Sequence, residues 1–206
     1  MASGARGVLI AFEGLDQSGK QTQAERLRDR LVAGGREVRL VSFPDYDTPI
    51  GREIGQALRG ERTFGPDVMQ LLYVANRHEW KPEIERATAA GAIIICDRYL
   101  ASSIAYGEAL GLDPAWLAEI QRFLPRAAVT LLLDIPPEVS AQRKTSDRDR
   151  YERDLALLGR VRASYHRQAA AGADPAARDR WVRFDAARDR DAVSADVWAA
   201  IAPHLR

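Results

Sequence analysis

Five short apolar runs, separated by longer amphipathic stretches, constrain the fold of this chain more than any other feature. Each run is too short for a helix, and continuous apolar composition is typical of parallel strands buried on both faces. The runs cover Val8–Phe12, Val38–Ser42, Ala92–Asp97, Val129–Asp134 and Trp181–Asp185. Because parallel strands need crossover helices, the alternation predicts a three-layer α/β/α fold with a central parallel sheet of about five strands.

The stretches between these runs predict the helices. Asp67 is a candidate N-cap for one of them, and Pro82 predicts a kink or a break within it. No repeat or linker divides the chain, so residues 1–206 are predicted to form a single domain. The predicted helices cover Lys20–Ala33, Asp67–Ala90, Leu100–Leu110, Pro114–Phe123, Pro137–Lys144, Tyr151–Ala170 and Asp191–Ile201.

Composition excludes several classes of protein. The chain is 46% hydrophobic and 29% charged, which is ordinary for a globular domain and excludes a disordered or collagen-like chain. Lys and Arg number 30 against 29 Asp and Glu, and a net charge of +1 argues against a nucleic-acid partner. The single cysteine, Cys96, excludes an intramolecular disulfide and a cysteine-rich zinc site. No apolar run is long enough for a membrane span or a signal peptide, so we expect a cytoplasmic protein with no membrane partner.

The most specific motif directly follows the first predicted strand and opens the first predicted helix. In this setting the backbone N–H groups of a P-loop cradle phosphates, and Lys20 reaches the β- and γ-phosphates. The position after that lysine usually holds a Ser or Thr ligand of Mg²⁺ but is Gln21 here, so phosphates, water and a distant carboxylate are expected to hold the metal. The alternative is a glycine-containing turn with a chance lysine. The predicted ATP-binding residues are Gly14, Leu15, Asp16, Gln17, Ser18, Gly19, Lys20, Gln21 and Thr22.

A second candidate site lies at the end of the strand predicted over Ala92–Asp97. Asp97 and Arg98 follow one another there, and ligands of open α/β sheets bind outside the carboxyl ends of the strands. Asp97 is placed to hold Mg²⁺ or its water, and Arg98 to grip a phosphate. The alternative for this dipeptide is a surface ion pair.

With these motifs in place, the chain resembles the thymidylate kinase family from end to end. The family pattern implies phosphorylation of dTMP to dTDP, a step of dTTP biosynthesis, with ATP as donor and Mg²⁺ as cofactor. It also implies a homodimer. The segments that carry the resemblance are Phe12–Lys20, Phe43–Tyr46, Leu71–Arg77, Asp97–Tyr106, Leu133–Glu138, Arg150–Glu152 and Trp181–Ala186.

The resemblance assigns the thymine base to two segments of the sequence. Tyr73 stacks on the base and Arg77, four residues later on one helix face, bonds its O4 atom. Phe43 and Pro44 line the base. Without the family pattern, Tyr73 also fits a core aromatic of an amphipathic helix.

The sugar and the acceptor phosphate are assigned to further residues in the same way. Ser103, with Ser102 beside it, lies near the base N3 atom, and Tyr106 crowds the 2′ position of the sugar. Asp16 accepts a bond from the 3′-hydroxyl, although an Asx turn is an alternative for it. Arg98 and Tyr46 bind the 5′-phosphate. The chain departs from the family pattern at two places near these residues. Asp45 and Asp47 flank Tyr46, where some relatives carry arginine, and Gly107 follows Tyr106, where many relatives carry glutamine.

A charged segment, about residues 143–152, corresponds to the mobile lid of the family. Arg143 is expected to contact the adenine of ATP, whereas Arg148 and Arg150 are candidates for stabilising the transferred phosphoryl group, with Lys144 behind them. Gln17 is neutral where one subgroup of the family carries an arginine in the P-loop. A solvated loop with paired charges is the alternative.

Two other functions stay open from the sequence. One is a kinase for another deoxynucleotide or a deoxynucleoside, which would not need Arg98 and Tyr46 for an acceptor phosphate. The other is a P-loop regulatory or nucleic-acid-linked ATPase, against which the near-zero net charge argues. The predicted catalytic residues of the kinase are Lys20, Asp97, Arg98, Arg148 and Arg150, with Asp97 near the metal.

Overall fold

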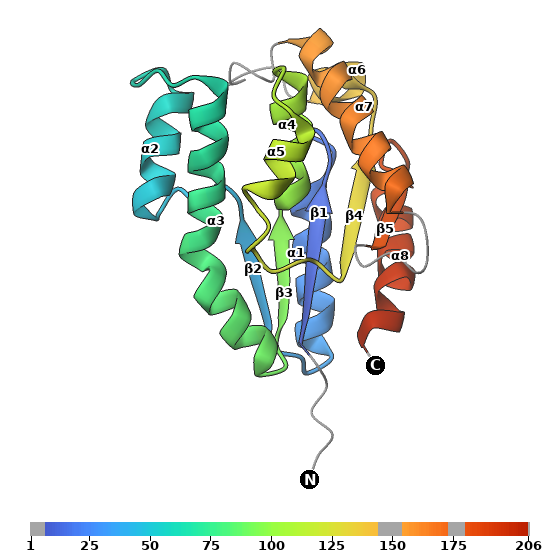
Figure 1. The fold of residues 1–206 in the computed structure, drawn as a ribbon. Coiled ribbons are helices and arrows are strands. Elements are labelled where there is room, and N and C mark those ends of the chain that lie inside the picture. The colour runs from blue at the N-terminus through green and yellow to red at the C-terminus, as the bar shows by residue number, and fades with distance from the viewer. Residues whose placement is uncertain (1–6, 144–153, 173–179, 206) are drawn as a thin grey trace.

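The computed structural model describes residues 7–143, 154–172 and 180–205, with one parallel sheet at its centre (Figure 1). The strand order across the sheet is β2-β3-β1-β4-β5, and every pair of neighbours runs parallel. Helices cover both faces, so the predicted three-layer α/β fold is confirmed. The strands are β1 (Val8–Glu13), β2 (Val38–Ser42), β3 (Ile93–Asp97), β4 (Val129–Asp134) and β5 (Arg180–Asp185).

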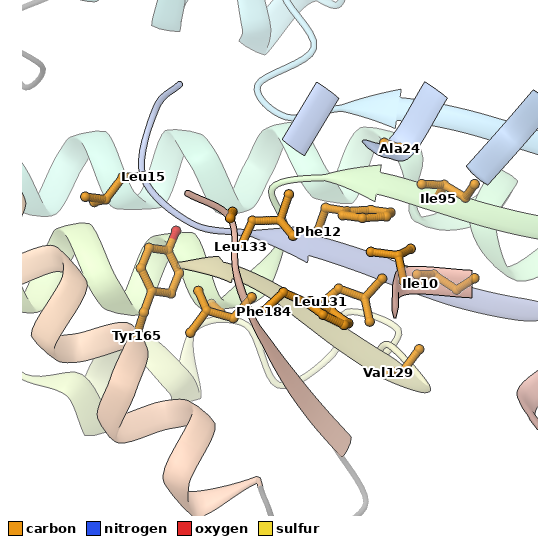
Figure 2. Close-up of a cluster of buried hydrophobic side chains, with 14 of the residues drawn as sticks. Ile10, Phe12, Leu15, Ala24, Ile95, Val129, Leu131, Leu133, Tyr165 and Phe184 are labelled. Atoms are coloured by element: carbon orange, nitrogen blue, oxygen red, sulfur yellow. The ribbon is translucent and has the colours of Figure 1, made fainter. Parts of the chain in front are cut away.

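Side chains of β1 alternate between two clusters of the core, because successive residues of a strand point to opposite faces of the sheet. Ile10 and Phe12 of β1 belong to one cluster, in which Figure 2 places Ala24 of α1 beside them. Leu9 and Ala11 belong to a second cluster, together with Ile84 and other residues of α3. The central strands β1 and β3 are buried on both sides, which explains their continuous apolar sequence.

The helices follow the predicted order, with α1 and α8 on one face of the sheet and α3, α4 and α7 on the other (Figure 1). A short 3₁₀ helix, Ala202–Leu205, extends α8. The helices that correspond to predicted ones are α1 (Lys20–Ala33), α3 (Pro66–Ala89), α4 (Leu100–Ala109), α5 (Pro114–Glu119), α6 (Pro137–Arg143), α7 (Leu155–Ala171) and α8 (Arg190–Ile201).

Several predicted helix ends were wrong. Helix α3 begins at Pro66 after the N-cap Gly65, so Asp67 lies in the first turn rather than at the cap. The helix also runs through Pro82 without a break, since that residue lies on the exposed side, where an unpaired carbonyl can reach water. Helix α7 begins at Leu155, not at residue 151, because the Asp154 side chain caps it by accepting a bond from Leu157 N at 2.9 Å. Helix α5 ends at Glu119, and turns occupy residues 120–123.

Helix α2 (Pro49–Leu58) was not predicted. Its start has a clear local signal, since the Thr48 hydroxyl accepts a bond from Gly51 N and Pro49 occupies the first helical position. Ile54 and Ala57 bury the inner face of α2 against Met69 of α3. The α2–α3 pair thereby builds a wall beyond the end of β2.

The carboxyl ends of all five strands meet at one edge of the sheet, because every pair runs parallel. The P-loop follows β1 there, Phe43 follows β2, and Arg98 follows β3. This edge is where open α/β sheets bind their ligands. Among the residues that the structure describes, no helix has the length and apolar character to cross a membrane.

Candidate functional site

The P-loop connects β1 to α1 in a conformation that depends on its glycines. Gly14 has a φ of 141°, and a Cβ atom there would lie 2.4 Å from the carbonyl oxygen of Leu133. Gly19 has a φ of 92° and is the N-cap of α1. Gln17, at a φ of 60°, is one of two non-glycine residues with positive φ in the described chain. The loop thus lies tightly against β4, and the N-terminus of α1 faces the space above it.

Lys20 is almost completely buried, although it carries the charge on which the P-loop prediction depends. Its Nζ atom donates a hydrogen bond to the carbonyl oxygen of Leu15 at 2.8 Å. Burial lowers the pKa of the Lys20 ammonium group, and the positive charge of Arg98 adds to this shift. An anionic ligand such as a phosphate in the loop would offset both effects.

The P-loop borders a cavity of about 540 Å³, which we call the donor cavity. Residues 16–22 line it together with Asp97 and Arg143. Gly14 and Leu15, which were also predicted to bind ATP, do not line it, and the Leu15 side chain packs in the core. Arg143, the last residue of α6, donates to the carbonyl oxygens of Gln17 and Ala186, both at 3.1 Å.

Sequence analysis missed the other side of the donor cavity. Arg190, the first residue of α8, and Arg188, just before this helix, line it together with Ala186, Val193 and Gln23. The Gln23 amide donates to the backbone carbonyl of Arg190 at 3.0 Å and thereby links α1 to α8. Both arginines lie within five residues of the end of β5, at the edge of the sheet where ligands bind. This position could have identified them from the sequence.

The donor cavity contains groups that suit Mg²⁺. Asp97 Oδ1 is buried and makes no hydrogen bond within the described part of the chain. Across the described ranges, no group of three or more His, Cys, Asp or Glu side chains could hold a metal. Mg²⁺ commonly takes one or two carboxylates and completes its shell with phosphate oxygens and water, so Asp97 fits it. Gln21 donates its amide to Glu25 at 3.0 Å.

A second, smaller cavity of about 120 Å³ adjoins the first and is called here the acceptor cavity. Every residue that the sequence assigned to dTMP lines it, and Asp16 lines both cavities. Leu58 and Gln70 also line the acceptor cavity and were not predicted. The predicted residues are Asp16, Phe43, Pro44, Tyr46, Tyr73, Arg77, Arg98, Ser102, Ser103 and Tyr106.

The loop after β2 forms one wall of the acceptor cavity, and α3 anchors it. The Phe43–Pro44 peptide is cis. Asn76 is fully buried; its Oδ1 atom accepts from Asp45 N at 2.9 Å, and its Nδ2 atom donates to Thr48 Oγ1 at 2.8 Å. The Asp45 carboxylate accepts from Trp80 Nε1 at 2.7 Å. Because neither Asp45 nor Asp47 lines the cavity, these two acids do not oppose a phosphate there.

Arg77 is a buried residue in the wall of the acceptor cavity. Its Nη1 atom donates to Ser103 Oγ at 2.7 Å, and its guanidinium carbon lies 5.9 Å from the centre of the Phe43 ring. The side chain is 3% exposed, and its Nε atom has no hydrogen-bond partner among the described residues. Burial lowers the pKa of Arg77. A polar base edge would satisfy this guanidinium.

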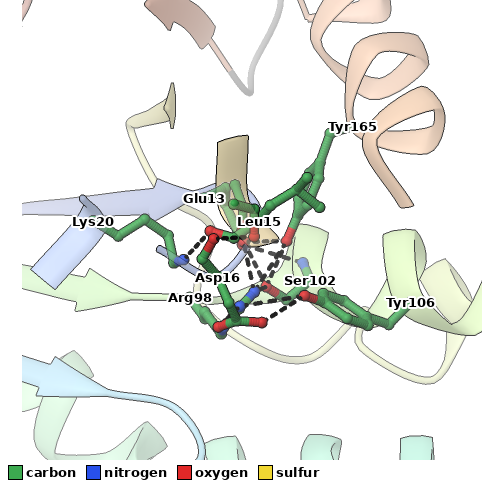
Figure 3. A network of polar contacts seen from close by, with 10 residues as sticks. Glu13, Leu15, Asp16, Lys20, Arg98, Ser102, Tyr106 and Tyr165 are labelled. Atoms are coloured by element: carbon green, nitrogen blue, oxygen red, sulfur yellow. Dashed lines mark hydrogen bonds and ion pairs between the residues drawn. The ribbon is translucent and has the colours of Figure 1, made fainter. Parts of the chain in front are cut away.

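Arg98 and Asp16 form an ion pair at the junction of the two cavities, shown in Figure 3. Arg98 Nη2 donates to Asp16 Oδ1 at 2.6 Å, and the Tyr106 hydroxyl donates to Asp16 Oδ2 at 3.1 Å. Burial alone would raise the pKa of Asp16, but the charges of Arg98 and Lys20 hold it well below the ordinary value. Asp16 therefore stays ionised and fixes Arg98 at the junction.

Comparisons with known proteins agree with this arrangement. The sequence model of the thymidylate kinase family matches residues 12–197. The chain belongs to the thymidylate kinase family. This assignment confirms the predicted family and enzyme class, a dTMP kinase.

Individual relatives match over nearly the whole chain. A thymidylate kinase of Caenorhabditis elegans is 35% identical over 204 residues, which cover 94% of this chain and 89% of the relative. One of Thermomicrobium roseum is 37% identical over 205 residues, which cover 93% of each. The solved structure of a Candida albicans thymidylate kinase superposes with a TM-score of 0.84 at 32% identity and covers 97% of this chain and 92% of that one.

Gln70 is the acceptor-cavity residue with the clearest unsatisfied chemistry. It is 1% exposed, and its Oε1 atom has no hydrogen-bond partner among the described residues. Burying an unpaired amide costs about 1–3 kcal/mol. We therefore expect Gln70→Leu to raise the free energy of unfolding of the ligand-free protein by about 1 kcal/mol. Chemical denaturation measures this change.

The same variant is expected to bind dTMP several-fold more weakly by calorimetry, because the cavity loses its amide. Gln121→Leu is a matched control: Gln121 is buried at a different place and donates to the carbonyl oxygens of Leu100 and Leu117. This control is expected to lose stability and keep dTMP affinity. A Gln70→Leu protein with lower stability and unchanged affinity would show that the amide has a purely structural role.

Proposed function

We propose that this protein transfers the γ-phosphoryl group of ATP to dTMP and produces dTDP by direct in-line displacement. The observation that carries the proposal is the junction of two unlike cavities at Asp16. One has a P-loop, a buried lysine and further arginines; the other has aromatic walls, the buried guanidinium of Arg77 and the partly buried guanidinium of Arg98. A donor triphosphate and an acceptor monophosphate would meet at their shared wall.

Positioning and charge stabilisation account for catalysis in this proposal, because phosphoryl transfer needs little covalent chemistry from the protein. Lys20 and the P-loop N–H groups hold the donor phosphates. Arg98 receives the acceptor phosphate while Asp16 keeps its guanidinium in place. Asp97 would hold Mg²⁺, which when bound neutralises charge on the donor phosphates.

The base and the sugar occupy the remainder of the acceptor cavity in this proposal. Tyr73 stacks on thymine, with Phe43 and Pro44 on the same wall, and Arg77 with Ser103 meets its polar edge. Tyr106 lies beside Asp16 and crowds the sugar, which favours a deoxyribose. Tyr46, about half exposed, closes the outer side near the phosphate.

The decisive experiment is a coupled ADP-release assay with and without an acceptor. We expect turnover with dTMP in the presence of Mg²⁺. Turnover with dUMP, dCMP or thymidine is expected to be much slower. A preference for thymidine would favour a nucleoside kinase. ADP release without an acceptor, or release stimulated by DNA, would favour a P-loop ATPase instead.

Arg77→Ala is expected to raise the KM for dTMP roughly 10- to 100-fold, because a buried hydrogen bond to a charged group is lost. The KM for ATP is expected to change less than twofold, since Arg77 lines only the acceptor cavity. Arg86→Ala is the matched control, because Arg86 lies on the same helix but pairs with Glu83 at the surface. A larger effect on ATP than on dTMP would reverse the assignment of the two cavities.

We also propose a homodimer that acts in the cytoplasm with ATP and dTMP as its partners and without nucleic acid. Exposed apolar side chains support the dimer: Val68 and Leu71 project from α3, and Phe123 follows α5. The net charge of +1 gives no general attraction to polyanions. Sedimentation at micromolar concentration should give twice the mass of one chain, and the mass of one chain would contradict the dimer.

A further inference from the structure

Glu13 is the last residue of β1 and has no exposed surface, yet sequence analysis gave it no role. Its Oε1 atom accepts hydrogen bonds from Tyr99 N at 2.8 Å and Ser102 N at 3.2 Å. Its Oε2 atom accepts from the hydroxyls of Ser102 at 2.6 Å and Tyr165 at 3.1 Å. Four donors therefore surround one carboxylate, between the start of α4 and the middle of α7 (Figure 3).

The two hydroxyls that meet Glu13 also meet Arg98. Arg98 Nη1 donates to Ser102 Oγ at 3.3 Å and to the Tyr165 hydroxyl oxygen at 3.5 Å. It donates to the carbonyl oxygen of Gly14 at 3.2 Å as well. A guanidinium group only donates, so both hydroxyls must present lone pairs to it. They can do so because their single protons are engaged elsewhere.

We propose that Glu13 is a positioning residue for the acceptor phosphate: it takes the hydroxyl protons of Ser102 and Tyr165, so that the lone pairs of both oxygens face Arg98. Asp16 holds the other end of the same guanidinium through Nη2. The backbone supports this arrangement, since Arg98 N donates to the carbonyl oxygen of Phe12, next to Glu13. The inference rests on the proposed function, in which Arg98 binds the phosphate of dTMP.

Glu13→Gln is the sharpest test because it keeps the size of the side chain and changes the direction of its hydrogen bonds. The two backbone N–H groups of α4 retain the amide oxygen, so the NH₂ group falls on the side of Ser102 and Tyr165. There it donates to a hydroxyl oxygen whose lone pairs Arg98 needs. At least one hydroxyl must then turn its proton toward the guanidinium, which displaces Arg98 from its position.

The measurement is the affinity for dTMP and for thymidine, by calorimetry without ATP, and the result is the ratio of the two. Glu13→Gln is expected to weaken dTMP binding about tenfold, since a charge-assisted hydrogen bond is lost, and to leave thymidine within twofold. A merely structural role would weaken both ligands alike, because α4 also carries Ser103 and Tyr106 of the nucleoside site. Such a parallel loss would overturn the proposal.

Two further variants test whether the effect of Glu13→Gln on the ratio of affinities depends on Arg98. Glu108→Gln is the matched control, because Glu108 also joins α4 to α7, through Ser164 at 2.5 Å and Arg167 at 2.6 Å, but lies outside both cavities. It should leave the ratio unchanged. In an Arg98→Met background, Glu13→Gln should also leave the ratio unchanged; a further tenfold loss there would show that Glu13 acts without Arg98 and would refute the inference.

The test also separates this inference from the proposed function. If the unaltered protein binds dTMP no more tightly than thymidine, the assignment of Arg98 to the acceptor phosphate fails first. If Glu13→Gln does not fold, Tyr165→Phe removes one of the two hydroxyl acceptors and is expected to shift the ratio in the same direction by about threefold. An unchanged ratio in Tyr165→Phe would then count against the role of the network.

Discussion

Lys20→Ala is expected to lower kcat by about 10²–10³-fold, because one preorganised charge is lost from the P-loop. Lys20 is 6% exposed and its Nζ atom already lies in the P-loop, bonded to Leu15 O at 2.8 Å. It therefore needs little rearrangement to reach a donor phosphate. The fold should survive, because burial lowers the pKa of this ammonium group, which shows that its charge is costly in the ligand-free protein.

Single-turnover kinetics and thermal unfolding together check this expectation. The unfolding midpoint of Lys20→Ala should equal or exceed that of the unaltered protein. Lys81→Ala is the matched control, since Lys81 lies on α3 and pairs with Glu85 at 3.8 Å, far from the P-loop in the sequence and outside both cavities. Near-normal turnover in Lys20→Ala would refute the P-loop assignment, whereas unfolding would show a structural role.

The parts of this molecule that sequence reasoning recovers are those with local causes. The strands β1 and β3 are apolar throughout because helices cover both of their faces. The P-loop is a contiguous motif in which Gly14 and Gly19 satisfy local backbone demands. The family pattern brought Tyr73 and Arg77 together with Arg98, and these residues line one cavity.

The parts that it missed depend on partners far away in the chain. In the sequence, Asp45 is an acid next to the predicted phosphate-binding residue. In the structure it is hydrogen-bonded to Trp80 and Asn76, more than thirty residues later, and it does not line the acceptor cavity. Glu13 lies one residue beyond the predicted first strand, and its hydrogen-bond partners lie 86 to 152 residues away. Helix α2 was overlooked although Thr48 and Pro49 mark its start, because its apolar face matters only against α3.

Because the P-loop contains no arginine, a second large effect on kcat is expected from arginines outside it. Gln17 is neutral, so it cannot offset the charge that develops on the transferred phosphoryl group. Arg143 ends α6 at the donor cavity, where it donates to Gln17 O at 3.1 Å. The next residues, 144–153, lie outside those that the structure describes, and they include Arg148 and Arg150. The chain thus enters this basic segment directly beside the P-loop.

We propose that Arg148 or Arg150 supplies the positive charge at the transition state. An arginine in that role contributes on the order of 10³ to kcat in phosphoryl transfer. Arg148→Ala and Arg150→Ala, measured separately, are expected to include one variant with at least a hundredfold lower kcat and nearly unchanged affinity for ATP and dTMP. Its loss should appear in kcat because the contact forms only as the phosphoryl group moves.

Arg122→Ala is the matched control for these two variants, since Arg122 is exposed, follows α5 and lines neither cavity. If one variant instead loses ATP affinity with kcat retained, that arginine binds the ground state of the donor. If both variants retain full kcat, neither Arg148 nor Arg150 acts at the transition state. Lys20 and Arg98 would then be the cations that stabilise it together with Mg²⁺, and the effect of Lys20→Ala should approach the upper end of its expected range.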